Sequence, residues 1–526
     1  MRKLTRLLYA TGVLLLVARL CQAECVPEHA PLQPNQDALA RLLKAQDRCP
    51  VTTPDFLNLV EGSGAKLETT MVNFLGFHNP DPGVFFLFQI VSGQLAGPNL
   101  SIERGDLLFG HFLAANDRSQ LILDTGGLLV EAIAWDPAKQ MFNFYELTKA
   151  KDCKQPGAHW CYRGDSRLVL EDTELLDRPR GAGQEPFHNR LRCSGCHMNG
   201  GLVQKELAPP HNDWFVTSRK LPLGNLTPDA TVTKIFHGLV DADELMKLVQ
   251  ASSRRLAASP EYRKALQSRT MQEQLRPLFC AVELNIESDR DPVDQHKPAV
   301  QIPAGFFVDP RLAASAIAIP RESYEQALKR LQSQLPEQPV PSDADHAWLT
   351  PVKANSDMVM MEALVEMRVI DSEFVADVLA VDFTDPLFSA SRCRLLRLVP
   401  PAGPDFLTRF EANLKASPEP AAKQLLDNLT DPNRDAKFHR QRAADYLDAC
   451  QKRAAKPEAT IEWFGVLAQR RAEVDREEIS QHPRGHILES PDRVVFPSSS
   501  APSGGQIDVK WTVGQRFEWF DRRELV

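Results

Sequence analysis

Five consecutive residues, Cys193-Ser194-Gly195-Cys196-His197, place two thiols and an imidazole in one short segment. Thiolates and imidazoles are nucleophiles and metal ligands, so this segment could attach a haem covalently, bind zinc, or act as a redox-active dithiol. For haem attachment, two thiols separated by two residues reach the two vinyl groups on one edge of the porphyrin. The histidine that follows then lies beneath the iron as an axial ligand.

The zinc interpretation lacks a second Cys-x-x-Cys pair, and the dithiol interpretation lacks the fold context that it needs. A structural zinc ion takes four ligands, usually with a second cysteine or histidine pair at comparable spacing, and the chain has no second Cys-x-x-Cys pair. A thioredoxin-like dithiol lies in a strand-helix-strand context, whereas this segment lies between a loop and Gly200-Gly201. The spacing therefore predicts one covalently attached haem c.

The segment from Phe187 to Trp214 resembles the c-type cytochrome family, and the resemblance does not extend over the rest of the chain. It implies that Cys193 and Cys196 carry the thioethers and that His197 is the proximal iron ligand. The flanking residues resemble those of large bacterial proteins with a single haem. The chain departs from small electron-carrier cytochromes in being several times longer, which puts simple electron shuttling in doubt.

The sixth iron ligand distinguishes two classes of function. A methionine thioether closes the iron to substrates and suits single-electron transfer, whereas an open position suits a peroxidase or an oxygenase. In small c-type cytochromes the methionine follows the motif by roughly 40 to 70 residues, which indicates Met246 and, less closely, Met271. His211 and His237 are the histidine alternatives. We expect electron transfer with Met246 as the distal ligand; the alternative is a haem enzyme with an open or exchangeable sixth position.

Two further groups could bind ligands but are better explained by packing. Thioethers favour copper, but the methionines occupy both faces of one predicted helix, which indicates core packing. The aromatic and charged residues of the second group are interpreted as core aromatics with a surface ion pair. The first group is Met358, Met360, Met361 and Met367, and the second is Trp135, Tyr145, Trp160, Tyr162, Arg163 and Asp165.

The N-terminus has the pattern of a secretory signal. Basic residues precede the apolar run Leu7 to Ala18, which is too short to span a bilayer, and cleavage is expected after Ala23. A lipid anchor at Cys21 or Cys25 is the alternative. We therefore expect an exported, soluble, periplasmic protein with no integral membrane segment after cleavage.

Cysteine usage agrees with export. Outside the signal and the haem motif, Cys25 is expected to pair with Cys49 and Cys153 with Cys161. Three cysteines remain, so one thiol is left over, and the spacing does not say which. They are Cys280, Cys393 and Cys450.

The charge of the chain limits its partners. The formal net charge of the 526 residues is −8, and loss of the four basic residues of the signal takes it to about −12. This balance argues against nucleic acid or anionic lipid as a partner and is compatible with docking on a basic redox protein, whose identity the sequence does not give.

The hydrophobic pattern predicts an α+β chain. Short alternating or apolar runs, such as residues 84–91 and 128–135, predict an antiparallel sheet, whereas residues 241–251, 260–282, 358–369, 371–381 and 437–453 have helical spacing. We expect a signal over 1–23, a β-rich N-terminal domain over 24–180, a mainly helical cytochrome c-like haem domain over 181–340, and a helical C-terminal region with a flexible tail over 341–526.

Overall fold

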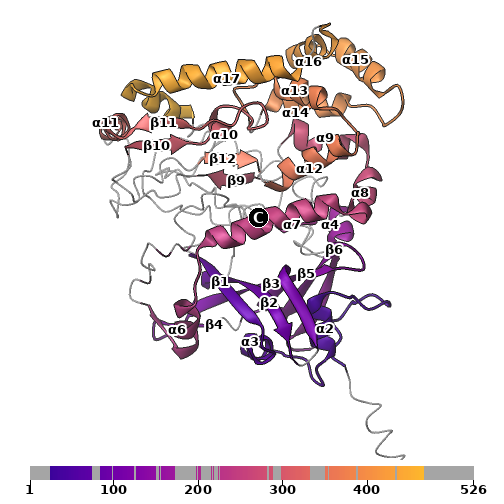
Figure 1. The fold of residues 1–526 in the computed structure, drawn as a ribbon, viewed down its shortest axis with the longest axis vertical. Coiled ribbons are helices and arrows are strands. Elements are labelled where there is room, and N and C mark those ends of the chain that lie inside the picture. The colour runs from indigo at the N-terminus through magenta and orange to yellow at the C-terminus, as the bar shows by residue number, and fades with distance from the viewer. Residues whose placement is uncertain are drawn as a thin grey trace, which may run out of the picture.

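The computed structural model describes residues 24–73, 83–96, 99–123, 126–149, 153, 156–171, 197, 199–202, 215, 217, 223, 226–280, 284–287, 298–331, 350–353, 355–386, 389–432 and 435–466. The expected α+β organisation is confirmed. An antiparallel sheet forms the N-terminal part and helices dominate the rest (Figure 1).

The main sheet runs in the order β1-β2-β3-β5-β6-β7, with every neighbouring pair on this path antiparallel. The short strand β4 pairs with the end of β3. The bounds are β1 Lys66–Asn73, β2 Gly83–Leu95, β3 Leu100–Ala115, β4 Gln120–Leu123, β5 Leu128–Asp136, β6 Met141–Thr148 and β7 His159–Asp165.

Both faces of this sheet are buried. Alternate residues of a strand point to opposite faces, so Leu87 and Val91 of β2 belong to one core, whereas Phe86 and Ile90 belong to the other. In β6 every residue is buried for this reason. The sheet is therefore the middle layer of the N-terminal part rather than a sheet with one solvated face.

Two short helices, α2 (Ala38–Lys44) and α3 (Thr53–Gly62), cover one face of the sheet (Figure 1). Each begins at a side-chain cap: Asp37 accepts from the backbone N–H of Ala40, and Thr52 from that of Asp55. The apolar side chains of these helices join the core formed by Leu107 and its neighbours in the sheet. These caps fix where the covering layer starts.

The chain returns to the sheet beyond residue 215. Phe215 N–H donates to the carbonyl of Met71, β8 (Thr227–Pro228) pairs in parallel with β4, and Val240 N–H donates to the carbonyl of Thr69. Helix α6 (Ala230–His237) follows β8 and packs on β4. These contacts join the expected β-rich and haem domains through backbone hydrogen bonds, and the boundary at 181 stays a prediction.

Helix α7 (Ala242–Ala258) lies across the second face of the sheet, between it and the remaining helices (Figure 1). The helical pattern over 260–282 forms two helices, α8 (Pro260–Gln267) and α9 (Met271–Phe279). They separate because Thr270 forms a capping box with Glu273, so a new helix starts there. The predicted helical structure over 260–282 is therefore present, but it is divided into two helices.

Further helices and two small sheets complete the described chain. The helices include α12 and α13, which correspond to the patterns over 358–369 and 371–381. The remaining bounds are α4 Ser166–Glu171, β9 Leu284–Glu287, β10 Ala299–Ile302, α10 Ala304–Phe307, β11 Ile317–Pro320, α11 Arg321–Leu331, β12 Thr350–Lys353, α12 Asn355–Glu366, α13 Ser372–Leu379, α14 Ala390–Arg394, η4 Leu395–Leu398, α15 Phe406–Ala416, α16 Pro420–Thr430 and α17 Ala436–Arg453; β10 pairs with β11 and β9 with β12.

One apolar core joins the second face of the sheet to the helical part. It runs from Phe86 and Phe144 in the sheet through Leu256 in α7 to Phe374 in α13. Each helix contributes one apolar stripe, and these stripes cannot be buried separately. The two parts therefore fold around shared side chains.

The cysteines pair as the sequence predicted and resolve the choice that it left open. Cys25 pairs with Cys49 and Cys153 with Cys161, with Cα–Cα distances of 4.9 and 6.4 Å. Cys280 pairs with Cys393 at a Cα–Cα distance of 4.7 Å, which links α9 to α14 across 113 residues. Cys450 is the buried free thiol among the described cysteines. Disulfides of this kind are compatible with export.

The described residues contain no helix of sufficient length and apolar character to cross a bilayer. The predicted signal over 1–23 lies outside the described residues.

Candidate functional site

The described part of the haem motif is His197, followed by Asn199 to Leu202; Cys193, Cys196 and Met198 lie outside the described residues. The ring nitrogen Nδ1 of His197 is 2.7 Å from the carbonyl oxygen of Gly201. A carbonyl oxygen only accepts, so Nδ1 carries the proton and the lone pair of the neutral imidazole is on Nε2. This is the arrangement in which a histidine binds a metal ion through Nε2.

A tight turn brings the Gly201 carbonyl back to the imidazole. The backbone N–H of Gly200 donates to the carbonyl of His197 at 2.6 Å, and Gly200 has a φ of +68°. A Cβ atom at this position would lie 2.4 Å from the carbonyl oxygen of Ser166, the first residue of α4. Both the left-handed backbone and the close approach require glycine, so the turn is specified by the sequence.

The sheet contacts the turn through apolar surface. The ring of Phe144 in β6 lies 5.1 Å from that of His197, measured between centroids. Leu202 is 3% exposed and belongs to the core shared with the sheet. Ser166, against which Gly200 packs, is tied to β6 because its hydroxyl accepts the backbone N–H of Phe142 at 3.0 Å. The sheet therefore holds the histidine in place by steric contacts.

The helices contact the same turn through hydrogen bonds. The hydroxyl of Tyr262 in α8 donates to the carbonyl of Asn199 at 2.5 Å. The Asn199 amide, which is buried, donates to Oδ1 of Asp357 in α12 at 3.2 Å. Since buried polar groups that lose a partner are expensive, these bonds hold the turn in one position. His197 is therefore held between the two structural parts of the chain.

A group of buried charges lies behind Asp357. The pKa of Lys353 is lowered to about 7, first by burial and then by the charges of Arg311 and Arg392, while Asp309 and Asp357 oppose the shift. Burial alone would raise the pKa of Asp309, but the charge and hydrogen bonds of Arg311 hold that pKa well below its ordinary value. The motif turn thus connects, through Asp357, to an ionised interior.

Arg392 is a further buried cation in this region. Its guanidinium donates to the backbone carbonyls of Val381, Asp385 and Pro386 at 3.0 to 3.3 Å. Lys353 donates through Nζ to the carbonyl of Pro277. Carbonyl dipoles as well as carboxylates therefore solvate these charges.

The structure places the candidate sixth ligands at different depths. Met246 is buried on α7. It precedes Leu256 by ten residues, which is about 15 Å along the helix, and the side chain of Leu256 lies near Gly201 of the turn. Met271 is buried at the start of α9 and belongs to the core, whereas His237 is exposed at the end of α6. His211 lies outside the described residues. Met246 as distal ligand stays a prediction.

Two residues that hold the turn, Tyr262 and Asp357, were not found from the sequence. They follow the motif by 65 and 160 positions in chain numbering and have no motif of their own. Of the sequence features noted above, the methionine group of α12 is the one nearest to these residues, because the sulfur of Met360 is 3.3 Å from the hydroxyl of Tyr262. Met360 and Met361 are buried, as packing in the core requires.

A second group of possible metal ligands lies in the sheet region. Donor atoms of Glu28, Cys153, His159 and Cys161 lie within 4.8 Å of one another. The two sulfurs form the disulfide, and a disulfide sulfur does not offer the thiolate that zinc binds. His159 Nε2 lies 3.2 Å from Oε2 of Glu28. The group is therefore a disulfide beside the contact between His159 and Glu28.

The aromatic group near the end of the sheet is core, as expected. Trp135, Tyr145, Trp160 and Tyr162 are each at most 8% exposed. The expected surface ion pair does not form: Arg163 instead lies 2.7 Å from Glu146 across β6 and β7, with both side chains less than 8% exposed, and Asp165 pairs with Lys139. The alternation of a fully buried strand does not reveal this, because both of its faces are covered.

Comparison of the chain with protein-family models, with curated proteins and with solved structures gives no match.

Proposed function

We propose that this chain is an exported, periplasmic c-type cytochrome that holds one haem covalently through Cys193 and Cys196, with His197 as an iron ligand, and that it transfers single electrons. The redox partner is a protein whose surface complements the acidic charge of the chain. When bound, the haem supplies an iron that gains and loses one electron.

One observation carries this proposal: Nδ1 of His197 is bonded to the Gly201 carbonyl within a turn that two structural parts hold in place. The bond keeps the proton on Nδ1 and leaves the Nε2 lone pair for a metal. It also limits rotation of the ring. A histidine in the alternative tautomer would present an N–H at Nε2 and could not bind iron there.

The residues around the turn account for its rigidity. Tyr262 and Asp357 fix Asn199, and Ser166 fixes Gly200 from the opposite side. A metal ligand that does not move between oxidation states keeps the reorganisation energy of electron transfer small. The arrangement therefore supports electron transfer better than it supports a mobile catalytic side chain.

The first test measures covalent haem. The native chain, expressed with a cytochrome c maturation system, is expected to retain one haem after denaturation, and the C193A/C196A double variant is expected to retain none. The matched controls for His197→Ala are His237→Ala, an exposed histidine, and His111→Ala, a buried one. Only His197→Ala should change the absorption spectrum of the attached haem. Absence of covalent haem from the native protein would contradict the proposal.

The second test separates electron transfer from haem catalysis. The dithionite-reduced protein is expected to show a low-spin spectrum that carbon monoxide does not change, because the sixth position is closed. Met246→Leu is expected to abolish the thioether-to-iron charge-transfer band, and Met271→Leu is the matched control. Rapid carbon monoxide binding to the native protein would favour the alternative, a peroxidase- or oxygenase-like enzyme.

A further inference from the structure

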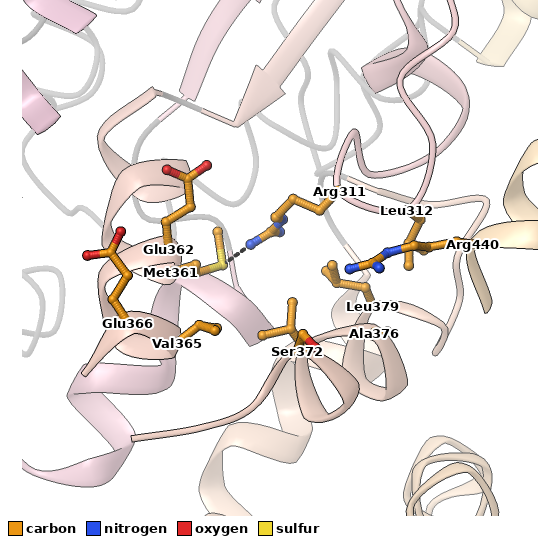
Figure 2. Close-up of a pocket in the computed structure, with 11 residues that line it drawn as sticks. Arg311, Leu312, Met361, Glu362, Val365, Glu366, Ser372, Ala376, Leu379 and Arg440 are labelled. Carbon is orange, nitrogen blue, oxygen red and sulfur yellow. Dashed lines mark hydrogen bonds between the residues drawn. The ribbon is translucent and has the colours of Figure 1, made fainter. Parts of the chain in front are cut away.

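A cavity of about 320 Å³ lies in the helical part, and its lining includes no residue of the described haem-motif turn (Figure 2). Helix α12 forms one wall through Met361 and Val365, and α13 forms another through Ser372 and Leu379. The segment after α10 contributes Arg311, and α17 contributes Arg440. A cavity of this size, formed by four separate elements, is large enough for a small organic molecule.

The walls of the cavity are mostly apolar. Met361, Val365, Val375 and Leu379 present thioether or branched aliphatic side chains. The hydroxyl of Ser372 is engaged with the carboxylate of Glu373 at 3.0 Å. The body of a ligand in this space would therefore be apolar, since the walls offer few hydrogen bonds.

Two guanidinium groups approach the cavity from the same side (Figure 2). Arg311 is already neutralised by Asp309, whose oxygens accept from its Nε and Nη2, and its Nη1 contacts the sulfur of Met361. Arg440 has no hydrogen bond or ion pair with any residue of the described chain. Of the two cations that line the cavity, the one without a partner is therefore Arg440, whose side chain is exposed.

The two acidic residues of the lining do not neutralise Arg440. In Figure 2 the carboxylates of Glu362 and Glu366 point away from the two arginines, so their aliphatic stems border the cavity. Glu366 is paired with Arg263 of α8 instead. The cavity thus combines an apolar interior with a cation at one end.

We propose that this cavity binds an organic monocarboxylate with an apolar body. The carboxylate pairs with Arg440, whose planar guanidinium can hold both oxygens, and the apolar body lies against Met361, Val365 and Leu379. Burial of the body supplies affinity, and the guanidinium supplies selection for an anion. The proposal uses no residue of the haem motif, so it stands or falls independently of the cytochrome function.

Titration of the full chain with octanoate, followed by isothermal calorimetry, tests this proposal. Saturable binding to one site is expected, with affinity about tenfold weaker in Arg440→Gln. Arg442→Gln is the matched control, because Arg442 lies on the same helix but contacts Phe383 and Phe438 rather than the cavity. The control should bind octanoate as the native chain does.

A second variant and a second probe keep the test decisive. Val365→Phe fills the cavity from a partly buried position and should abolish octanoate binding without lowering the thermal midpoint by more than a few degrees. Octylammonium has the same chain and the opposite charge, and should bind at least tenfold more weakly than octanoate. No saturable binding of octanoate, equal binding of octylammonium, or unchanged binding in Arg440→Gln would overturn the proposal.

Discussion

Each of the two parts of the chain that hold His197 buries an aspartate, and the two aspartates have partners of different charge. In the sheet region, Asp37 accepts hydrogen bonds from the neutral donors Tyr145 and Asn143, and burial raises its pKa to about 6. In the helical region, Asp309 lies beside Arg311 and near Lys353, and these cations hold its pKa well below the ordinary range. Two buried aspartates therefore shift in opposite directions because their partners differ in charge.

The same contrast is present at the turn itself. The sheet region contacts it by shape, through Ser166 and the ring of Phe144. The helical region contacts it by hydrogen bonds from Tyr262 and to Asp357. Steric contacts do not depend on pH, whereas a bond to a carboxylate beside a titrating lysine does. Each side of the turn can therefore be tested by a different kind of experiment.

The largest effect on stability is expected where the sheet region contacts the turn, at Gly200. Gly200→Ala adds a Cβ atom that would meet the carbonyl oxygen of Ser166 in a left-handed backbone, so the free energy of unfolding should fall by about 4 kcal/mol in urea titrations. Gly127→Ala is the control, because a Cβ there meets nothing within 4 Å and should change stability by less than about 0.5 kcal/mol. Equal effects of the two variants would show that the turn is not sterically fixed.

The sheet region also predicts a pH dependence. The pKa of Asp37 is higher in the folded chain than in the unfolded one, so the folded state binds more protons between about pH 4 and pH 6. Its contribution is complete below pH 4 and is lost as the pH rises through 6, up to about 3 kcal/mol. Asp37→Asn should remove this slope from urea titrations across that range. The exposed Asp55→Asn should leave it unchanged, and a slope retained in Asp37→Asn would assign it to another group.

The helical side predicts a pH dependence in a higher range, around the pKa of Lys353. Asp357→Asn removes a fully buried charge that accepts from Asn199 and favours protonated Lys353, so unfolding free energy should fall by about 2 kcal/mol at pH 6. At pH 8 most Lys353 is neutral in the native chain, since its pKa is about 7, so the loss should be smaller there. An equal loss at both pH values would contradict the coupling of Asp357 to Lys353.

The smallest effect is expected from Tyr262→Phe. The variant keeps the ring in the core and removes only the hydroxyl that donates to Asn199, at an expected loss of about 1 kcal/mol in unfolding free energy. The change should also loosen the turn, which hydrogen exchange at the Gly200 amide would measure. Unchanged exchange would indicate that the sheet side alone is sufficient.

Local patterns predicted local structure well in this chain. The apolar run of residues 84–91 and the helical spacing of residues 437–453 correspond to β2 and α17, because each pattern depends only on residues that are close in the sequence. The break at Thr270 shows the limit of such patterns, since an apolar stripe can continue through a capping box that ends one helix and starts another.

Contacts between distant segments were beyond the sequence. Tyr262 and Asp357 reach the turn because α8 and α12 pack together with α7, and nothing in their own neighbourhoods marks them. The same reason explains why the pairing of Cys280 with Cys393 could not be chosen over pairings with Cys450. Topology decides which distant groups meet, and a single sequence gives no separate signal for it.

The cytochrome proposal depends most directly on His197. The measurement is the absorption spectrum of the haem-loaded chain before and after His197→Ala, with the covalent haem of each quantified after denaturation. The account predicts one covalent haem and a low-spin spectrum in the native chain, and in the variant a covalent haem that has lost the low-spin spectrum. A native chain without covalent haem, or a variant with an unchanged low-spin spectrum, would contradict it.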